Sequence, residues 1–220
     1  MGRIIAVANQ KGGVGKTTTS INLAACLAEK GKKVLAVDMD PQGNLTSGLG
    51  IDKNTLEYTI YHAMSGEINI GECMIVHPLE HGLDLSVLPA NRDRAGAEVE
   101  LVDVEDPQHI LKNLLKSVKK KYDFIIIDCP PALGMLTINS MTAADTVLVP
   151  IQCEFFALDG LSQLIYTINL IKKKLNKSLE IEGVVFTMYD ARTNLSLEVV
   201  ENVKNNLDQF IYKTIIPSNV

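Results

Sequence analysis

Apolar runs of strand length recur along this chain of 220 residues, and most of them are continuous rather than alternating. They are rich in Val and Ile, and they cover residues 4–8, 34–37, 83–88, 124–127, 146–151, 183–188 and 212–216. A continuous apolar run of this length is typical of a strand that is buried on both faces of a sheet. The pattern therefore predicts a sheet that is covered on both sides.

Helical patterns lie between most of these runs. Apolar residues repeat at helical spacing within residues 110–118, 161–175 and 199–210, so each segment is expected to form a helix with one buried face. Strands and helices that alternate in this way build a mostly parallel sheet with helices on both faces. The sequence therefore predicts an α/β, doubly wound fold.

The region from residue 43 to residue 81 is less regular. It contains several glycines and a modest helical segment near residues 58–64. We expect a surface excursion rather than a second domain, so that residues 1–220 form a single domain. The chain ends shortly after the last predicted strand, and a bare face is unfavourable for a parallel sheet. We therefore expect that a C-terminal helical segment is missing.

Composition narrows the class of protein. The hydrophobic content of 46% and the charged content of 21% are ordinary for a globular protein, and no apolar run approaches the ~20 residues that span a bilayer. The four cysteines are widely spaced, which indicates reduced, mostly buried thiols in a cytoplasmic protein. A net charge of -5 argues against attraction of nucleic acid to the whole surface, but it allows one local basic face.

The candidate chemistry begins between the first predicted strand and the helix that follows it. This stretch reads Lys11-Gly12-Gly13-Val14-Gly15-Lys16-Thr17-Thr18. A strand that turns through glycines directly into a helix points several backbone N–H groups at one spot, which favours phosphate. Lys16 can contact the outer phosphates, and the Thr17 hydroxyl can ligate Mg²⁺. The stretch predicts a site for a nucleoside triphosphate with Mg²⁺.

Two features of this loop are irregular. The usual pattern G-x-x-x-x-G-K-[ST] has its first glycine where this chain has Gln10. Lys11 is a second lysine, too early in the loop to do the work of Lys16, although its neighbours keep it beside the phosphates. A glycine-rich turn without a ligand is the alternative, and the placement of Gly-Lys-Thr between strand and helix argues against it.

Three carboxylates follow predicted strands and complete the candidate site. Asp38 and Asp40 end the second strand, and Asp128 follows four apolar residues, as in a Walker B element. Ligands of open α/β sheets bind at the carboxyl ends of the strands. Asp128 is expected to reach Mg²⁺. Of Asp38 and Asp40, one can contribute to the Mg²⁺ site and the other can orient a water in line with the γ-phosphorus. For these two, an Asp-Pro turn that merely ends the strand is the alternative.

Together these residues resemble a known family, the deviant Walker A ATPases that include ParA, Soj and MinD. The resemblance covers essentially the whole chain and is nearest to chromosomal ParA proteins of the Soj type. It rests on NQKGGVGKTT at residues 9–18, DMDPQGN at 38–44, IDCPP at 127–131, PIQCE at 150–154 and DARTN at 190–194.

The resemblance implies a P-loop ATPase that uses ATP and Mg²⁺. It implies that Lys11 reaches across a nucleotide sandwich homodimer to the partner's phosphates, as an arginine finger does. Asp40 is then the residue most tied to water activation, which leaves Asp38, with Thr17 and Asp128, for Mg²⁺. The ATP-bound dimer is expected to bind DNA non-specifically, and a ParB-type protein to stimulate hydrolysis and release it. The expected location is the bacterial cytoplasm, on the nucleoid and away from membranes.

The contacts to DNA and to adenine also follow from the resemblance. Arg192 is the candidate DNA contact. The lysine runs at residues 119–121 and 172–174 are interpreted as solvated helix C-termini, where cations complement the helix dipole. Adenine is expected near Thr187, Met188 and Pro217, which follow two strand ends.

Other functions remain as alternatives. A MinD-like, membrane-associated regulator of cell division would need a C-terminal amphipathic helix. The residues Asn9 and Gln10 and the segment 41–44 look like ParA rather than MinD. An iron–sulfur reductase of the nitrogenase iron-protein type would need two cluster cysteines at the dimer interface, and Cys129 adjoins Asp128 too closely for that pattern. A non-catalytic nucleotide-binding scaffold would require that Asp40 be idle.

Overall fold

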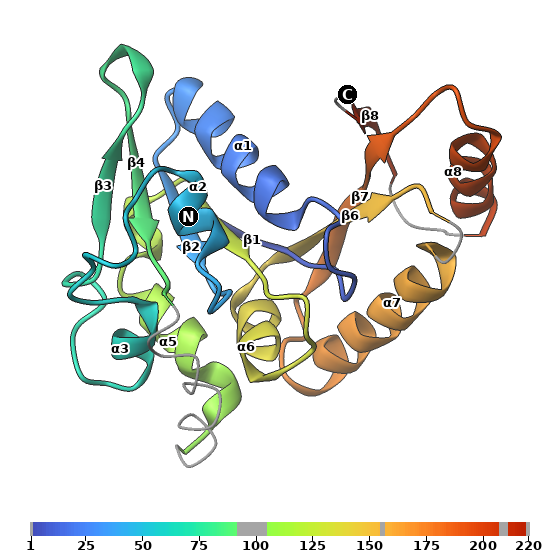
Figure 1. The fold of residues 1–220 in the computed structure, drawn as a ribbon. Helices are drawn as coiled ribbons and strands as arrows, with labels where there is room; N and C mark the ends of the chain where they lie inside the picture. The colour runs from blue at the N-terminus through green and yellow to red at the C-terminus, as the bar shows by residue number, and fades with distance from the viewer. Residues whose placement is uncertain (1, 92–104, 155–156, 207–210, 219–220) are drawn as a thin grey trace.

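A computed structural model describes residues 2–91, 105–154, 157–206 and 211–218, and its strands form one sheet (Figure 1). The strand order is β3-β4-β2-β5-β1-β6-β7-β8. Neighbouring strands are parallel, except for the antiparallel pair β3 and β4. The bounds are β1 Arg3–Val7, β2 Val34–Asp38, β3 Ile75–Pro78, β4 Asp84–Leu88, β5 Phe124–Asp128, β6 Thr146–Gln152, β7 Glu180–Tyr189 and β8 Ile211–Pro217.

Helices cover both faces of this sheet, so the predicted α/β, doubly wound fold is confirmed. Figure 1 shows α1 on one side and α5, α6 and α7 on the other. The α-helices are α1 Lys16–Glu29, α2 Asn44–Gly48, α3 Ile60–Met64, α5 Ile110–Lys116, α6 Met135–Ala143, α7 Ala157–Lys174 and α8 Asn194–Asn206. Short 3₁₀ turns lie at η1 Glu80–Gly82, η4 Pro107–His109 and η5 Lys119–Lys121.

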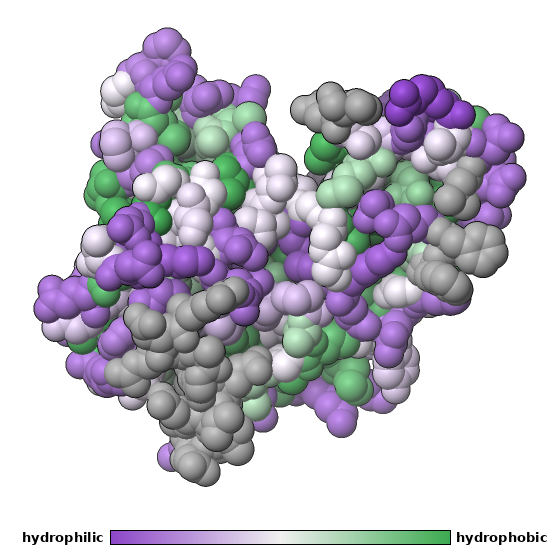
Figure 2. Space-filling model, in the orientation of Figure 1, coloured by the Kyte–Doolittle hydropathy of each residue, from purple (hydrophilic) through white to green (hydrophobic). Residues whose placement is uncertain are grey.

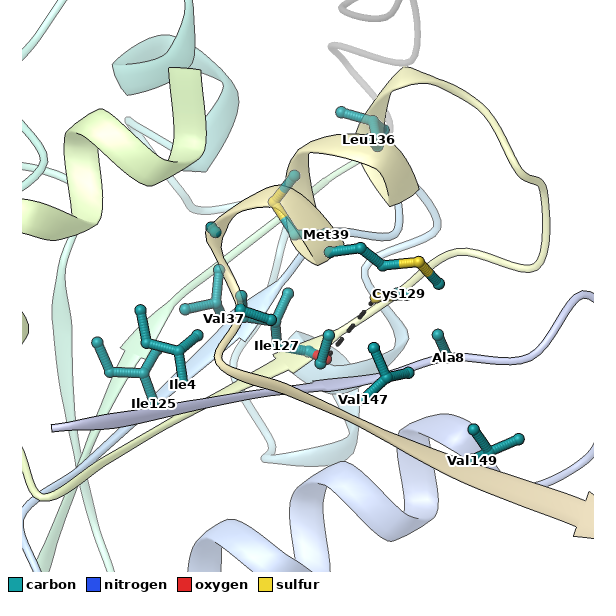
Figure 3. Close-up of a cluster of buried hydrophobic side chains, with 14 of the residues drawn as sticks. Ile4, Ala8, Val37, Met39, Ile125, Ile127, Cys129, Leu136, Val147 and Val149 are labelled. Carbon is teal, nitrogen blue, oxygen red and sulfur yellow. Dashed lines mark hydrogen bonds between the residues drawn. The ribbon is translucent and has the colours of Figure 1, made fainter. Parts of the chain in front are cut away.

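Each central strand divides its side chains between two cores. In β1, Ile4 and Ala6 belong to the core beneath α5, α6 and α7, whereas Ile5 and Val7 belong to the core beneath α1. Figure 3 shows the first core, where side chains from β1, β2, β5 and β6 and from the residues just after them gather near Leu136. Because side chains are buried on both faces, these strands are continuous apolar runs apart from the polar residues at their ends.

Strand β3 and helices α2 and α6 were not predicted from the sequence. Strand β3 lies at the edge of the sheet, and its burial alternates between half-buried and exposed residues, so it has no continuous apolar run. Helix α6 is buried almost all round and carries polar residues such as Thr137 and Asn139 inside, so it has no single apolar stripe. The predicted segments at 110–118, 161–175 and 199–206 form helices, and residues 207–210 lie outside the described residues.

The segment after residue 43 is more than a surface excursion, which corrects the sequence prediction. Ile60 and Tyr61 in α3 are almost completely buried and belong to the core beneath α6. The Tyr61 hydroxyl donates a hydrogen bond to the Met39 carbonyl, at 3.1 Å. The segment therefore packs directly against the residues that follow β2.

The cysteines agree with the prediction of free and mostly buried thiols. Cys73, Cys129 and Cys153 are buried and Cys26 is exposed, and none of them forms a disulfide. Among the helices of the described residues, none combines the length and the apolar character that crossing a lipid bilayer requires.

Candidate functional site

The glycine-rich loop connects the end of β1 to the first residue of α1. Gly13 and Gly15 have φ angles of 77° and 84°, which L-residues with a side chain rarely adopt, and Gly15 forms the N-cap of α1. The loop therefore turns sharply and directs its backbone N–H groups and the N-terminus of a 14-residue helix toward the same region. This is the local geometry that the sequence predicted for a phosphate site.

Buried hydrogen bonds fasten this loop to two other strands. The Asn9 side-chain amide donates to the Pro150 carbonyl in β6, at 2.7 Å, and its oxygen accepts the Lys11 N–H, at 3.0 Å. The Thr187 hydroxyl in β7 donates to the Val14 carbonyl, at 2.8 Å. Thr187 was predicted near the adenine, and the structure shows that it anchors the loop.

A cavity of about 410 Å³ opens at the loop and collects most of the predicted phosphate-binding residues. Its walls include Asp40 from the end of β2, which confirms that this carboxylate and the loop lie together. Asn44 and Pro131 also line it, although they were not predicted as site residues; each follows a predicted carboxylate closely in the sequence. The lining residues are Gly12, Gly13, Gly15, Lys16, Thr17, Thr18, Asp40, Asn44, Pro131 and Met188.

Lys16 lies in the wall of this cavity with only 7% of its surface exposed. Its ammonium group donates to the Lys11 carbonyl, at 3.0 Å, which bends the side chain back over the loop. Burial lowers the pKa of Lys16, while the nearby charges of Asp128 and Asp40 act in the opposite direction. The cavity therefore contains a desolvated cation that an anionic ligand would stabilise.

Thr17 and Asp128 form the candidate metal site. The Thr17 hydroxyl donates to Asp128 Oδ2, at 2.7 Å, and the Ser20 hydroxyl donates to Asp128 Oδ1, at 2.9 Å. Burial raises the pKa of Asp128 to about 6, although the two hydroxyl groups lower it. Within the described ranges, no cluster of three or more His, Cys, Asp or Glu side chains could hold a metal ion by itself. A cation at Thr17 would therefore need further oxygens from a ligand or water, as Mg²⁺ commonly does.

Asp38 and Asp40 occupy different environments, although only one residue separates them. Asp40 lines the cavity, whereas Asp38 is completely buried, beside Asp128 in the register of β2 and β5. Both oxygens of Asp38 accept hydrogen bonds from the protein, from the Asp40 N–H and from Thr46. Burial raises the pKa of Asp38 to about 7. A role for Asp38 at the Mg²⁺ site stays a prediction, and this arrangement does not favour it.

Lys11 is not among the residues that line this cavity. Its ammonium group forms an ion pair with Glu154, which follows β6. Both side chains are partly exposed to solvent. The structure therefore places Lys11 at the edge of the site.

The predicted adenine contacts lie at a second, larger hollow. A groove of about 840 Å³ separates α1 from β7 and β8, and Figure 2 shows it with hydrophobic residues on its walls. Thr187, Met188 and Pro217 all line it, and Met188 also lines the phosphate cavity. Met188 has a φ angle of 49°, an uncommon value for a residue other than glycine. These three residues are therefore brought together next to the phosphate cavity.

Arg192, the predicted DNA contact, lies in the turn between β7 and α8 with its side chain 74% exposed. Its guanidinium donates two hydrogen bonds to the Asp190 carboxylate, at 2.9 and 2.7 Å. These bonds lower the pKa of Asp190 to about 2. The lysine runs lie as predicted only in part, because 172–174 end α7 whereas 119–121 form the separate turn η5.

Comparison with known proteins adds the family. A family model described as an AAA domain matches residues 2–181. The sporulation initiation inhibitor protein Soj of Bacillus subtilis is 54% identical over 220 residues, which are 100% of this chain and 86% of that protein. The chromosome partitioning protein ParA of Myxococcus xanthus is 50% identical, over 100% of this chain and 77% of that protein. The chain belongs to the ParA/Soj family.

Solved structures agree with this assignment and with the fold. A cobyrinic acid a,c-diamide synthase from Mycobacterium smegmatis, with bound ATP analog and magnesium, has a TM-score of 0.93 and 39% identity. The match covers 100% of this chain and 88% of that one. A putative plasmid partition protein from Borrelia burgdorferi bound to AMPPNP has a TM-score of 0.82 and 28% identity, over 100% of this chain and 86% of that one. The ParA/Soj member described here therefore has a P-loop, α/β architecture.

Proposed function

We propose that this ParA/Soj family member binds ATP with Mg²⁺, hydrolyses it, and uses the cycle to partition chromosomes or plasmids. One observation carries the proposal: a glycine cradle, a buried lysine and the carboxylate of Asp40 line one cavity of about 410 Å³. The solved relatives with a bound ATP analog and with AMPPNP support ATP as the nucleotide.

The residues around the loop fit a triphosphate and its metal. A Cβ added at Gly13 would meet no atom within 4 Å, so the space beside this part of the loop is open to a ligand. Lys16 would neutralise the outer phosphates. Thr17 and Asp128 would hold Mg²⁺, which supplies positive charge that offsets the charge developing on the γ-phosphate. Met188 and Pro217, with Thr187, would border the adenine.

Asp40 is the residue that we assign to water activation. It lines the cavity, and among the described residues only one of its carboxylate oxygens accepts a hydrogen bond, Oδ1 from the Gln42 N–H at 2.9 Å. The second oxygen can accept a hydrogen bond from the attacking water. Lys11 would act in a homodimer, where its charge reaches the phosphates bound by the partner subunit.

The partitioning role rests on the named relatives. Soj and ParA are 54% and 50% identical to this chain, whereas the diamide synthase is 39% identical, so the partitioning proteins are the better guide. In this proposal the ATP-bound dimer binds DNA non-specifically, with Arg192 as one contact, and a ParB-type protein stimulates hydrolysis and releases it. The protein would act in the cytoplasm, on the nucleoid.

Phosphate release and DNA binding test the proposal together. Wild-type protein with Mg²⁺ and ATP is expected to release phosphate, and Asp40→Ala to bind ATP normally but turn over about 100-fold more slowly. Asp52→Ala, at an exposed position, serves as the control. With ATP, duplex DNA of any sequence should be shifted, and less so as salt is raised. Binding of ATP-loaded protein to anionic vesicles in place of DNA would favour the MinD-like alternative and refute this one.

A further inference from the structure

The main chain of Asp40 is held by two hydrogen bonds, one through its carbonyl and one through its N–H. The Asp40 carbonyl accepts the Gly43 N–H at 2.8 Å, and its N–H donates to Asp38 Oδ1 at 3.2 Å. Asp40 lines the phosphate cavity, but Asp38 is completely buried and does not. The position of Asp40 therefore depends on a carboxylate that has no access to the ligand.

Asp38 is in turn fixed by one residue of α2. Its Oδ2 atom accepts the Thr46 N–H at 2.8 Å and the Thr46 hydroxyl at 2.7 Å. A buried carboxylate held by two donors on one residue has little freedom to turn, because any other orientation would leave a buried acceptor unpaired.

The Thr46 hydroxyl also connects this carboxylate to a third segment. It accepts the Ala90 N–H at 3.0 Å, and its single proton is donated to Asp38. Thr46 is completely buried, so water does not compete for these bonds. One hydroxyl therefore links the end of β2, helix α2 and the segment after β4, next to Asp40.

We propose that Thr46 is a positioning residue for hydrolysis: acting through Asp38, its hydroxyl holds Asp40 where the attacking water must be oriented. The inference rests on the proposed function, because it assigns Asp40 to that water. Thr46 touches neither nucleotide nor metal in this proposal. Its loss should therefore affect turnover and leave nucleotide affinity almost unchanged.

Thr46→Val tests the hydroxyl, because valine keeps the shape of the side chain. It removes the two hydrogen bonds of the hydroxyl, to Asp38 and from Ala90, and keeps the backbone bond from the residue 46 N–H to Asp38. We expect kcat to fall about 10- to 100-fold, because a small displacement of a positioned catalytic group lowers the rate by that much. KM for ATP should change less than two-fold. Thr46→Ser should restore kcat to within about three-fold of wild type. The matched control is Thr142→Val in α6, another fully buried threonine, whose hydroxyl has no hydrogen-bond partner among the described residues.

Hydrogen exchange separates this inference from the proposed function. Residues 38–46 should exchange faster in Thr46→Val than in wild type or Thr46→Ser, whether or not ATP is hydrolysed. If wild-type protein did not hydrolyse ATP, the proposed function would be refuted. Hydrogen exchange of residues 38–46 would then still decide whether Thr46 holds this segment in place. Normal kcat, equal changes in kcat and KM, or unchanged exchange in Thr46→Val would overturn the inference. Should Thr46→Val fail to fold, Thr46→Ala replaces it; failure of both would also overturn the inference, since Thr46 would then serve stability alone.

Discussion

Lys11 in the phosphate loop and Glu154 after β6 form an ion pair, although the two residues are 143 positions apart in the sequence. The two side chains are 43% and 41% exposed, so solvent screens the pair, which is worth at most about 1 kcal/mol. Glu154 thus holds Lys11, the lysine that we propose to contact the partner's nucleotide. Breaking this ion pair costs little free energy.

The first prediction concerns this pair. Glu154→Gln should release Lys11 and tighten ATP-dependent dimerisation by about two- to five-fold, the range that a surface ion pair allows. Sedimentation with ATP, in an Asp40→Ala background that preserves the nucleotide, measures the dimer dissociation constant. The control is Glu180→Gln, which breaks the comparable surface pair with Lys172. Weaker dimerisation in Glu154→Gln, or an equal shift in the control, would contradict the prediction.

Lys16 is predicted to be indispensable for nucleotide binding. Lys16→Ala removes the buried cation of the cavity, and ATP affinity should fall at least about 100-fold, as expected for loss of a charge-assisted contact in a desolvated site. Isothermal titration calorimetry measures the affinity. Lys30→Ala, at the exposed C-terminal end of the same helix, should leave it unchanged. An unaltered affinity in Lys16→Ala would rule out the phosphate-loop assignment.

Gly12 is predicted to be required for ATP-dependent dimerisation but not for folding or ATP binding. A Cβ at this position meets no atom within 4 Å, and its φ is not among the positive values, so Gly12→Val should fold and bind ATP. In a sandwich dimer the added side chain would stand where two backbones approach, and ATP-dependent dimerisation should be lost. Gly13→Val is the contrast, because its φ of 77° would strain the loop and reduce ATP affinity. A Gly12→Val protein that still dimerises with ATP would refute this placement.

The strands and the phosphate loop were predictable because their signals are local. Strand β1 is apolar at every position from Ile4 to Val7, and Gly15, Lys16 and Thr17 are fixed relative to one another by a helix start. The bonds that join Asn9 to Pro150 and Thr187 to Val14 were not predictable. They connect residues that are 141 and 173 positions apart in the sequence. No local sequence pattern around Asn9 or Thr187 indicates which distant residue it will contact.

The same reasoning explains why the different environments of Asp38 and Asp40 could not be read from the sequence. Two carboxylates two positions apart on an extended segment share a direction, and the sequence alone could not distinguish them. What separates them is Thr46, which approaches Asp38 only after α2 folds back onto β2. The sequence therefore located the carboxylates correctly at the carboxyl ends of the strands but could not say which of them lines the cavity.

Gly43 is predicted to be needed for its conformation and for the space beside it. Its φ is 63°, and a Cβ would lie 2.6 Å from the Ala90 carbonyl oxygen. Gly50 has a φ of 77° with nothing within 4 Å, so Gly50→Ala isolates the conformational cost, about 1–2 kcal/mol. Gly43→Ala should reduce the free energy of unfolding by roughly 1–3 kcal/mol more, because of the clash. Denaturant unfolding of both variants checks this, and equal losses would show that the clash is relieved.

Asp128 should make the ligand-free protein less stable as pH rises. Burial raises its pKa from 3.8 to about 6, so the folded state binds this proton more tightly than the unfolded chain does. Its contribution to stability is full below pH 3.8 and is lost as pH rises through 6. At pH 8 the buried charge costs roughly 3 kcal/mol. Asp128→Asn removes that charge; one of the two hydroxyl groups, of Thr17 or Ser20, can turn to accept from the new NH₂ group, while the other still donates to the amide oxygen.

The variant should therefore be nearly as stable as wild type below pH 3.8, gain on it as the pH rises from 3.8 to about 6, and keep a roughly constant advantage above that, while losing Mg²⁺-dependent ATP binding. Urea unfolding without nucleotide at four pH values measures the difference. Asp38 also has a raised pKa but is present in both proteins, so most of its own contribution cancels. Asp84→Asn, at an exposed position, controls for the loss of one surface charge. A gap between variant and wild type that stays constant or narrows as the pH rises from 3.8 to 6 would mean that Asp128 is not desolvated in the free protein.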